Sequence, residues 1–403
     1  MNAPKLRFKD NNRKDFPDWN IGTLGDVFDY TNGKSFENEV LENGDYFLVT
    51  LNSIDISGKL KTDHKRVNKT DFSLKKNDLV MILSDVAHGN FLGLTDIIPN
   101  DRYVLNQRIG GLRAKTNIDV RYASLYINNK QKYFKLHGQG SSQQNLSKGD
   151  VLNFILPIPH LDEQTKIASF LTAVDEKITQ LTRKYDLLAQ YKKGVMQQIF
   201  SQTLRFKDDD GRDFPEWKET TLGDIATFFR GGMLSKSDIA EDGSFECVHY
   251  GELFTTYSEV IHSVRSRTNL TDTVKSETGD ILMPSSDVTP AGLAKASCIQ
   301  KTGVVLGGDI NIIRLMGGIE PIFISYMLNF EKNKIIQLVS GTTVKHIYIK
   351  DIKTIPLTLP RCNKEQTKIA NFLTAFDDKI THTQTQLSAA KQYKQGLLQQ
   401  MFV

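Results

Sequence analysis

The chain has 403 residues, 39% of them hydrophobic and 24% charged, which is the balance of a soluble globular protein with two or three domains. The composition excludes a disordered chain, and the lack of any run of about 18 apolar residues excludes a membrane-spanning helix. Because Met1–Lys5 also lacks the apolar stretch of a signal peptide, we expect a cytoplasmic protein without a membrane partner.

Charge and cysteine usage narrow the classes further. A net charge of +4 is too small for nonspecific polyanion binding by bulk charge, although it allows local basic patches. The three cysteines, Cys247, Cys298 and Cys362, are widely spaced. They predict reduced thiols rather than a disulfide framework or a zinc knuckle.

The opening segment of the chain occurs twice. The sequences Leu-Arg-Phe-Lys-Asp, Asp-Phe-Pro-Asp-Trp and Thr-Leu-Gly-Asp begin at Leu6, Asp15 and Thr23, and they return almost unchanged between Leu204 and Asp224. A repeat of roughly 200 residues is domain-sized, far longer than the repeat of a solenoid. We therefore expect a tandem duplication with internal pseudo-two-fold symmetry.

Each copy continues into a divergent insert whose short apolar runs, separated by Gly, Asn, Asp and Ser, are typical of β-structure. Strands are expected at Tyr46–Asn52, Asp78–Leu83 and Val104–Arg113 in the first insert, and at Phe245–Tyr250, Asp280–Pro284 and Val304–Arg314 in the second. Val120–Asn129 and Pro321–Asn329 predict one helix per insert. The expected fold of each insert is α+β, mainly β with short helices and an irregular sheet.

Each copy ends in a long helix that follows the repeated sequence Glu-Gln-Thr-Lys-Ile-Ala, at Glu163 and again at Glu365. Apolar residues then alternate at intervals of four and three, the pattern of a coiled-coil seam, and no proline interrupts either stretch of roughly 38 residues. The seam residues expected to pair the helices are Ile167, Leu171, Val174, Ile178, Leu181, Leu188, Ile369, Leu373, Phe376, Ile380, Leu387 and Leu397.

The symmetry of the repeat predicts how these helices are arranged. Copies related by a two-fold axis across the helices must run antiparallel, so the first Leu-Arg-Phe segment should pack near the end of the second helix and bring the termini together. Lys192 and Lys394 interrupt the seam. We expect them near the same height, setting the register or reaching the seam edge by their aliphatic stems.

Polar loops recur at matching places in the two inserts with different contents. Their Gln, Asn, Arg and Lys side chains can read base edges in a DNA groove, and their glycines allow close approach to phosphates. Turns use the same residue types, so an ordinary loop role stays open for each one. The candidate DNA-binding residues are Lys34, Ser35, Arg108, Gln139, Ser141, Gln143, Gln144, Asn145, Arg230, Lys236, Arg265, Arg267, Thr342, Lys345 and His346.

Catalytic motifs are missing from the sequence. Gly33-Lys34-Ser35 lacks the upstream glycine of a phosphate-binding loop, because Phe28 stands at that position. There is no His-Glu-x-x-His pair, no Cys/His cluster and no glycine fingerprint for a dinucleotide or methyl donor. We expect a chain that is not an enzyme and that binds neither metal nor cofactor.

The repeated opening with Trp19 and Thr23–Asp26, the Pro-x-Pro before Glu163, and the helix end Gln197–Phe200 together resemble the DNA-specificity subunit of type I restriction-modification systems. The resemblance covers essentially the whole chain. One departure is the looser proline element between Pro356 and Pro360, which affects a domain boundary only.

This resemblance implies two target-recognition domains, each reading one half of a bipartite site on double-stranded DNA, with two antiparallel coiled-coil helices that set the unread spacer. It implies two modification (methyltransferase) subunits and restriction or translocase subunits as partners, which would hold S-adenosylmethionine, ATP and Mg. The domains expected are 1–19, an N-terminal conserved segment; 20–158, recognition domain 1; 159–203, a central helix; 204–217, the repeated segment; 218–360, recognition domain 2; and 361–403, a C-terminal helix.

Two other functions fit parts of the pattern. A free-standing coiled-coil DNA-binding regulator or architectural protein that bridges two sites would use the same helix frame, and co-purification with an S-adenosylmethionine-binding subunit distinguishes it. A self-sufficient nuclease would need a carboxylate cluster that binds metal, and the sequence offers none outside the loop Asp208–Asp210.

Overall fold

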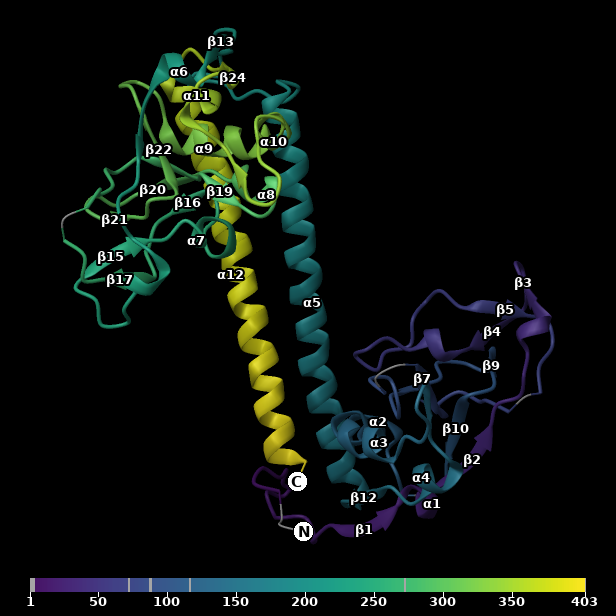
Figure 1. The fold of residues 1–403 in the computed structure, drawn as a ribbon. Coiled ribbons are helices and arrows are strands. Elements are labelled where there is room, and N and C mark those ends of the chain that lie inside the picture. Colours follow the sequence, from purple (N-terminus) through teal and green to yellow (C-terminus); the bar gives the residue numbers. More distant parts are fainter. Residues whose placement is uncertain (1–3, 72, 87–88, 116, 272, 403) are drawn as a thin grey trace. The chain divides into compact units, whose positions relative to one another are not determined.

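The computed structural model describes residues 4–71, 73–86, 89–115, 117–271 and 273–402. The chain forms two compact units, one of Met1–Thr182 with Gln386–Val403 and the other of Arg183–Thr385. Each unit holds one insert domain together with part of each of two long helices, α5 (Leu161–Phe200) and α12 (Asn363–Met401) (Figure 1). No helix among the described residues is long and apolar enough to cross a membrane.

The insert of the first unit is closed at its base by an antiparallel pair, in which Asn20 lies opposite Ile158. This pair consists of β1 (Asn20–Thr23) and β12 (Ile155–Ile158). The rest of the insert contains two four-stranded sheets, with the strand orders β2-β10-β6-β8 and β3-β5-β4-β9, and the two-stranded ribbon β7-β11. Their bounds are β2 Phe28–Asn32, β3 Val40–Leu41, β4 Tyr46–Val49, β5 Lys65–Val67, β6 Leu79–Ile82, β7 Ser84–Val86, β8 Thr95–Ile97, β9 Tyr103–Leu105, β10 Ile109–Ala114 and β11 Gln143–Asn145. The helices are α1 Leu24–Val27, α2 Val120–Asn129, α3 Gln131–His137 and α4 Lys148–Leu152, with short 3-10 turns at Glu37–Glu39 and Leu51–Ser53.

The second unit repeats this plan with one more strand in its main sheet. Lys218 lies opposite Leu359 in the basal pair β13 (Lys218–Thr221) and β24 (Pro356–Leu359), and the sheets have the orders β14-β22-β18-β20-β16 and β17-β15-β21, with the ribbon β19-β23. Their bounds are β14 Ala226–Arg230, β15 Phe245–Val248, β16 Val260–Ile261, β17 Ser266–Thr268, β18 Ile281–Pro284, β19 Ser286–Asp287, β20 Ser297–Ile299, β21 Val305–Leu306, β22 Ile310–Leu315 and β23 Lys345–His346. The helices are α6 Leu222–Ile225, α7 Glu252–Thr255, α8 Pro290–Leu293, α9 Pro321–Phe330, α10 Lys332–Gln337 and α11 Ile349–Ile352, with a 3-10 turn at Lys236–Asp238.

The predicted α+β class is confirmed, and each insert has more helices than the one whose position was predicted. Helix α2 has the predicted bounds, and α9 ends one residue later than predicted. The positions of short helices such as α3 and α4 were not predicted, because these helices are too brief to show a periodic apolar pattern. The expected strand Val104–Arg113 is also wrong as one element, since a turn with Arg108 at φ +69° divides it into β9 and β10.

Within each unit, α5 and α12 run antiparallel. In the first unit, Asp175 pairs with Lys394 at 2.6 Å, and the core combines Ile167 and Leu171 with Leu397 and Met401. In the second unit, Lys192 pairs with Asp377 at 2.6 Å, and the core combines Val195 and Ile199 with Ile369 and Leu373. The two lysines therefore belong to different units and have separate carboxylate partners, so the expectation that they lie together at one height is wrong.

The seam residues named from the sequence differ in how completely they are covered. Half-buried ones are Val174, Ile178, Leu188, Phe376 and Ile380, and buried ones are Ile167, Leu171, Leu181, Ile369, Leu373, Leu387 and Leu397. The fully buried residues include those that the insert domains also cover. The helices are thus part of each unit's core as well as a seam.

The repeated Glu-Gln motif anchors each helix start to the Leu-Arg-Phe segment. Glu163, which is 0% exposed, accepts hydrogen bonds from Arg7 Nε (3.1 Å), Arg7 Nη2 (2.8 Å) and Trp19 Nε1 (3.0 Å). Glu365 receives the same bonds from Arg205 and from Trp217. A buried carboxylate must be paired and hydrogen-bonded, which explains why these residue types recur together.

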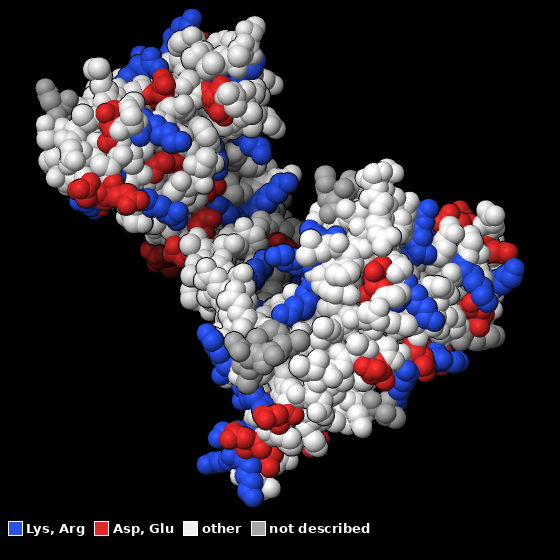
Figure 2. Space-filling model, turned by 60° about the horizontal axis from the view of Figure 1, so that its bottom comes forward, with Lys and Arg blue, Asp and Glu red and all other residues white. Residues whose placement is uncertain are grey.

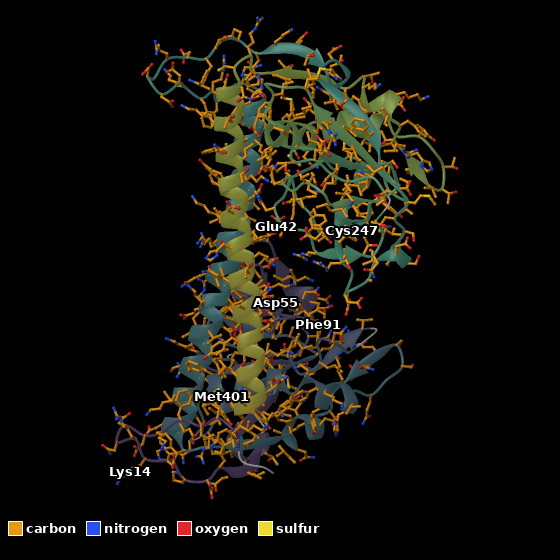
Figure 3. All side chains as sticks on the ribbon, turned by 90° about the vertical axis from the view of Figure 1, so that its left-hand side faces the viewer. Lys14, Glu42, Asp55, Phe91, Cys247 and Met401 are labelled. Carbon is orange, nitrogen blue, oxygen red and sulfur yellow. The ribbon has the colours of Figure 1, made fainter. Side chains whose placement is uncertain are left out.

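The chain ends lie in the same unit. Leu6 N–H donates to Gln400 O at 3.1 Å, as Leu204 N–H donates to Gln198 O at 3.0 Å where the chain is continuous. Lys14 of the opening segment and Met401 at the end of α12 lie toward the same end of this unit (Figure 3). The predicted packing of the first segment near the end of the second helix is therefore present.

Candidate nucleic-acid interface

Each insert has a corner where the loops with candidate residues meet on the same backbone frame. In the second unit, Ser285 N–H donates to Asp309 O (2.8 Å). In the first unit, Leu83 N–H donates to Arg108 O (2.9 Å) in the same way. We call these places the second corner (Arg230, Ser285, Asp309 and ribbon β19-β23) and the first corner (Asn32, Leu83, Arg108 and ribbon β7-β11).

The second corner presents an oriented arginine. Arg230 ends β14 and is exposed, and its Nη2 donates to Ser285 Oγ at 2.9 Å. The Ser285 hydroxyl in turn donates a hydrogen bond to Asp309 Oδ1 at 3.3 Å. A guanidinium has five N–H donors in a fixed fork. Arg230 is thus held by a short polar chain and is accessible to a ligand.

The first corner also presents an arginine, but from the opposite loop. Arg108 is exposed and stands where the second corner has Asp309. Asn32 stands where the second corner has Arg230, and its Oδ1 accepts from Tyr30 Oη at 2.6 Å. The two corners therefore share a frame and differ in which strand end supplies the positive charge.

The ribbons beside the corners are closed in the same manner. Bridges Gln139 to Asn145 and Ser340 to His346 close the loops, with Gly140 at φ +118° and Gly341 at φ +106° in the region that favours glycine. The remaining loop residues, Ser141 and Thr342, are exposed. The polar loops expected at matching places in the two inserts are therefore structurally equivalent.

Several ribbon side chains are used within the protein. Asn145 Oδ1 accepts from Ser84 Oγ, and its Nδ2 donates to Gln143 O at 3.1 Å. Lys345 Nζ donates to Gly341 O at 2.6 Å, and the half-buried His346 stacks on Tyr348 with ring centroids 6.1 Å apart. Gln144 turns inward, since its Oε1 lies 2.1 Å from where a Cβ on Gly89 would stand. Gln139 is exposed, and Gln143 is half-buried.

Other candidates are not part of the two corners as defined above. Lys34, next to the exposed Ser35, pairs with Asp71 at 3.5 Å, and Lys236 lies in the 3-10 turn Lys236–Asp238. Arg265 precedes β17, and Arg267 on β17 donates to Gly243 O (2.5 Å) and Ser244 O (3.1 Å). Arg66 donates to Gly44 O at 3.3 Å in the equivalent place of the first unit. The guanidinium of Arg267 thus holds a turn, which is a structural role.

Exposed apolar residues at the corners were missed from the sequence. Val86 and Val288 follow Ser-Asp in both ribbons and are 65% and 72% exposed. Asp85 and Asp287 accept the N–H of the following valine at 2.8 and 2.7 Å, which shapes the turn that projects it. Apolar side chains can contact the thymine methyl group in the major groove. The signal was available, because Ser-Asp-Val is the same in two otherwise divergent inserts.

On the face drawn in Figure 2, basic and acidic side chains are mixed over both inserts. Several of the basic groups are paired, including Arg113 with Asp78 (2.6 Å) and Arg314 with Asp280 (2.8 Å). Both pairs raise the pKa of the arginine through its hydrogen bond to the aspartate. Nucleic-acid contact at the corners would thus depend on a few placed donors.

Comparison with known proteins gives a consistent result. The family model described as "Type I restriction modification DNA specificity domain" matches residues 17–189 and 215–392. The MjaVIII specificity subunit of a type I restriction enzyme from Methanocaldococcus jannaschii is 22% identical over 378 residues, which cover 90% of this chain and 87% of that protein.

Solved structures share the fold. The crystal structure of the S subunit of a type I restriction-modification system from M. genitalium matches with a TM-score of 0.67 and 17% identity, covering 100% of this chain and 99% of that one. A second structure, from work on complex assembly and conformational transition of the type I system, matches with a TM-score of 0.53 and 18% identity over 96% of this chain and 98% of that one.

Proposed function

The chain belongs to the type I restriction-modification DNA specificity family, and we propose that it is the specificity subunit of such a complex, with each insert domain reading one half of a bipartite site on double-stranded DNA. The observation that carries this proposal is the pair of equivalent corners. One backbone frame presents an exposed arginine in both units, but from different loops. Two readers with one frame and different donors suit a target with two unlike halves.

Arg230 and Arg108 are the residues we propose as base readers. Arginine donating to O6 and N7 of guanine is the commonest specific contact in the major groove. The hydrogen bond from Arg230 to Ser285 orients the guanidinium before DNA binds. Replacing Arg230 by Ala should weaken specific binding by about 1–3 kcal/mol and relax the target at one base pair. A uniform loss over all sequences would instead indicate a phosphate contact.

Two modification subunits are the proposed protein partners, one for each unit. Large apolar side chains recur exposed at equivalent positions, which is where protein interfaces form. Tyr191 and Tyr393 are 56% and 57% exposed on the long helices, and Leu6 and Leu204 are exposed on the repeated segments. Restriction or translocase subunits would join this assembly. S-adenosylmethionine, ATP and Mg would be bound by the partners.

We propose that the chain itself recognises the DNA site and does not catalyse methylation or cleavage. Purified alone it should neither methylate nor cleave DNA, and methyl transfer should appear when modification subunits are added. Methyl transfer by the isolated chain would contradict this. Binding of DNA without any co-purifying S-adenosylmethionine-binding subunit would favour the alternative, a free-standing regulator.

Domain exchange tests the two-reader model. Replacing residues 20–158 by the corresponding domain of a relative should change one half of the methylated motif in genomic DNA and leave the other half intact. The reciprocal exchange of residues 218–360 is the matched control. Changes in both halves from either exchange would refute the model.

A further inference from the structure

The first unit contains a pocket of ≈ 630 Å³, a volume typical of ligand sites. It lies between β8, α2 and the parts of α5 and α12 that belong to this unit, and all of its lining residues are in the first unit. Ile97, Ser124, Leu125, Asp175 and Lys394 are among its lining residues. Helix α2 lies against α5 in this unit (Figure 1).

The second unit fills the corresponding space with its own residues. Ser124 and Ser325 are equivalent, since each donates to the neighbouring strand, to Thr95 O (3.4 Å) and Ala296 O (3.0 Å) respectively. The residues that follow them, Leu125 and Tyr326, are therefore equivalent as well. The Tyr326 hydroxyl donates to Asp377, the counterpart of Asp175. Strand β16 then adds to the edge of β20 and brings in Glu259.

Three donors hold Glu259 in that place. Cys298 N–H and Ser325 Oγ donate to its backbone carbonyl at 2.8 and 2.7 Å, and Lys192 Nζ lies 3.3 Å from its Oε1. The corresponding groups in the first unit are Ile97 N–H, Ser124 Oγ and Lys394 Nζ. All three residues line the pocket. The first unit thus retains the donors that receive a glutamate in the second unit.

Among the described residues, the first unit provides no strand in the place of β16. Its main sheet ends at β8, and the chain forms a tight turn there instead, with Gly58 N–H donating to Asp55 O at 2.9 Å and Leu60 bridged to Ile54. Asp55, labelled in Figure 3, accepts Ser57 N–H (2.8 Å) and Lys59 N–H (3.0 Å) and so fixes that turn. Pro99 stands at the position of Gln300, whose N–H donates to Ile261 O in the second unit. Because proline has no N–H, a strand added in the first unit would pair over a shorter length.

Charge around the pocket also differs between the units. Among the residues that the structure describes, Lys192 has two carboxylate partners, Asp377 and Glu259, whereas Lys394 has one, Asp175. The pocket adds the cationic groups of Lys59, Arg121 and Lys391, against Asp96 and Asp175. Arg121 is paired with Asp119, so the charges that remain are the three lysines Lys59, Lys391 and Lys394 against the two aspartates. One positive charge is left over. An acidic group would complement it.

We propose that this pocket binds an extended segment of a partner protein that carries a glutamate or aspartate. The carboxylate would pair with Lys394, and a backbone carbonyl of the segment would accept from Ile97 N–H and Ser124 Oγ. Identifying the partner as a modification subunit rests on the proposed function. Because the second unit fills this space itself, the two modification subunits would dock on the two units with unequal contacts.

Filling the pocket tests the proposal. In Leu125→Tyr, the ring would occupy the space as Tyr326 does, with Asp175 as the hydrogen-bond acceptor. Titration of the full chain with purified modification subunit should show two sites in the wild type, and the affinity of one should fall at least tenfold in Leu125→Tyr. The volume-conserving Leu125→Met is the matched control and should bind as the wild type does. Unchanged affinity of both sites in Leu125→Tyr would overturn the proposal.

Photo-crosslinking gives a second measurement that does not depend on a buried substitution. Asn129 is exposed at the pocket, so a benzophenone amino acid placed there leaves the core intact. In the assembled complex it should crosslink to a partner peptide containing Asp or Glu, whereas the same probe at the exposed Lys132, outside the pocket, should not. Absence of a partner crosslink at Asn129 would also overturn the proposal. A wild-type chain that binds no modification subunit at all would instead end the proposed function itself.

Discussion

Removing one arginine should loosen the first unit at its base. In Arg7→Met, the carboxylate of Glu163 stays buried and loses the guanidinium that donates to it at 2.8 and 3.1 Å, leaving only Trp19 Nε1. Arg7 also donates to Phe16 O (3.2 Å) and Pro17 O (2.6 Å), so two carbonyls lose their donor. Breaking a buried ion pair from one side costs about 3–5 kcal/mol.

That loss is large enough to measure as a thermal shift. The first unit comprises Met1–Thr182 and Gln386–Val403, and for a unit of that size about 1 kcal/mol moves the midpoint by about 2–4 °C. The expected decrease is therefore about 6–20 °C for the transition of the first unit. Calorimetry of the full chain should resolve it, and Arg205→Met should produce the same loss in the second unit through Glu365.

The exposed Lys14 provides a control on the same segment, because a surface substitution there should change stability by less than about 0.5 kcal/mol. Equal midpoints for Arg7→Met and Lys14→Met would refute the reasoning. Glu163→Leu combined with Arg7→Met should recover part of the loss, since it removes the unpaired buried charge.

Three further predictions use the repeat. A circular permutant that joins Val403 to Met1 through a short linker and opens near Gln202 should fold and bind DNA. The reason is that Leu6 N–H bonds to Gln400 O as Leu204 N–H bonds to Gln198 O. An insoluble permutant beside a folded wild type would count against this prediction. Inserting one heptad after Thr182 and another after Gln384 lengthens both helices by about 10.5 Å, and methylation mapping should show about three more spacer base pairs between unchanged half-sites. Original spacing would mean that the helices do not separate the readers. Hydrogen bonds from Thr23 and Thr221 lower the pKa of Asp26 and Asp224 in the folded protein. The stability that these carboxylates contribute is therefore present above their unfolded pKa near 3.8 and is lost as the pH falls through the lower folded pKa. Denaturant titration below pH 4 should show this loss of stability, and the Asp26→Asn, Asp224→Asn double variant should make the stability less dependent on pH.

Local signals with a clear period or cap were sufficient to predict parts of this fold. Helix α2 was placed correctly because its apolar positions recur with helical spacing, and Asp119 caps it by accepting Arg121 N–H. The antiparallel packing of the long helices followed from the repeat alone. Fold features that depend on one residue's backbone conformation, such as the turn at Arg108, leave no periodic trace.

The candidate interface was harder to predict because residue type does not show which hydrogen-bond capacity is already used. Arg267 and Arg230 look alike in the sequence, yet the first donates to two carbonyls of a turn, and the second is held by a single serine. Gln144 lies in the polar loop that was expected to face DNA and instead turns toward Gly89. The corners themselves were not predictable, since they bring together strand ends that lie far apart in the chain.

The division of the chain between units also affects the order of folding during synthesis. The second unit, Arg183–Thr385, is continuous, whereas the first needs residues from both ends of the chain. Phe402 packs against Tyr122 and Tyr126 with ring centroids 5.9 and 5.3 Å apart, and Leu397 and Met401 belong to the same core. On the ribosome, the insert that is made first therefore waits for the core residues that α12 contributes near its end, while the insert made second can finish folding before those residues are made.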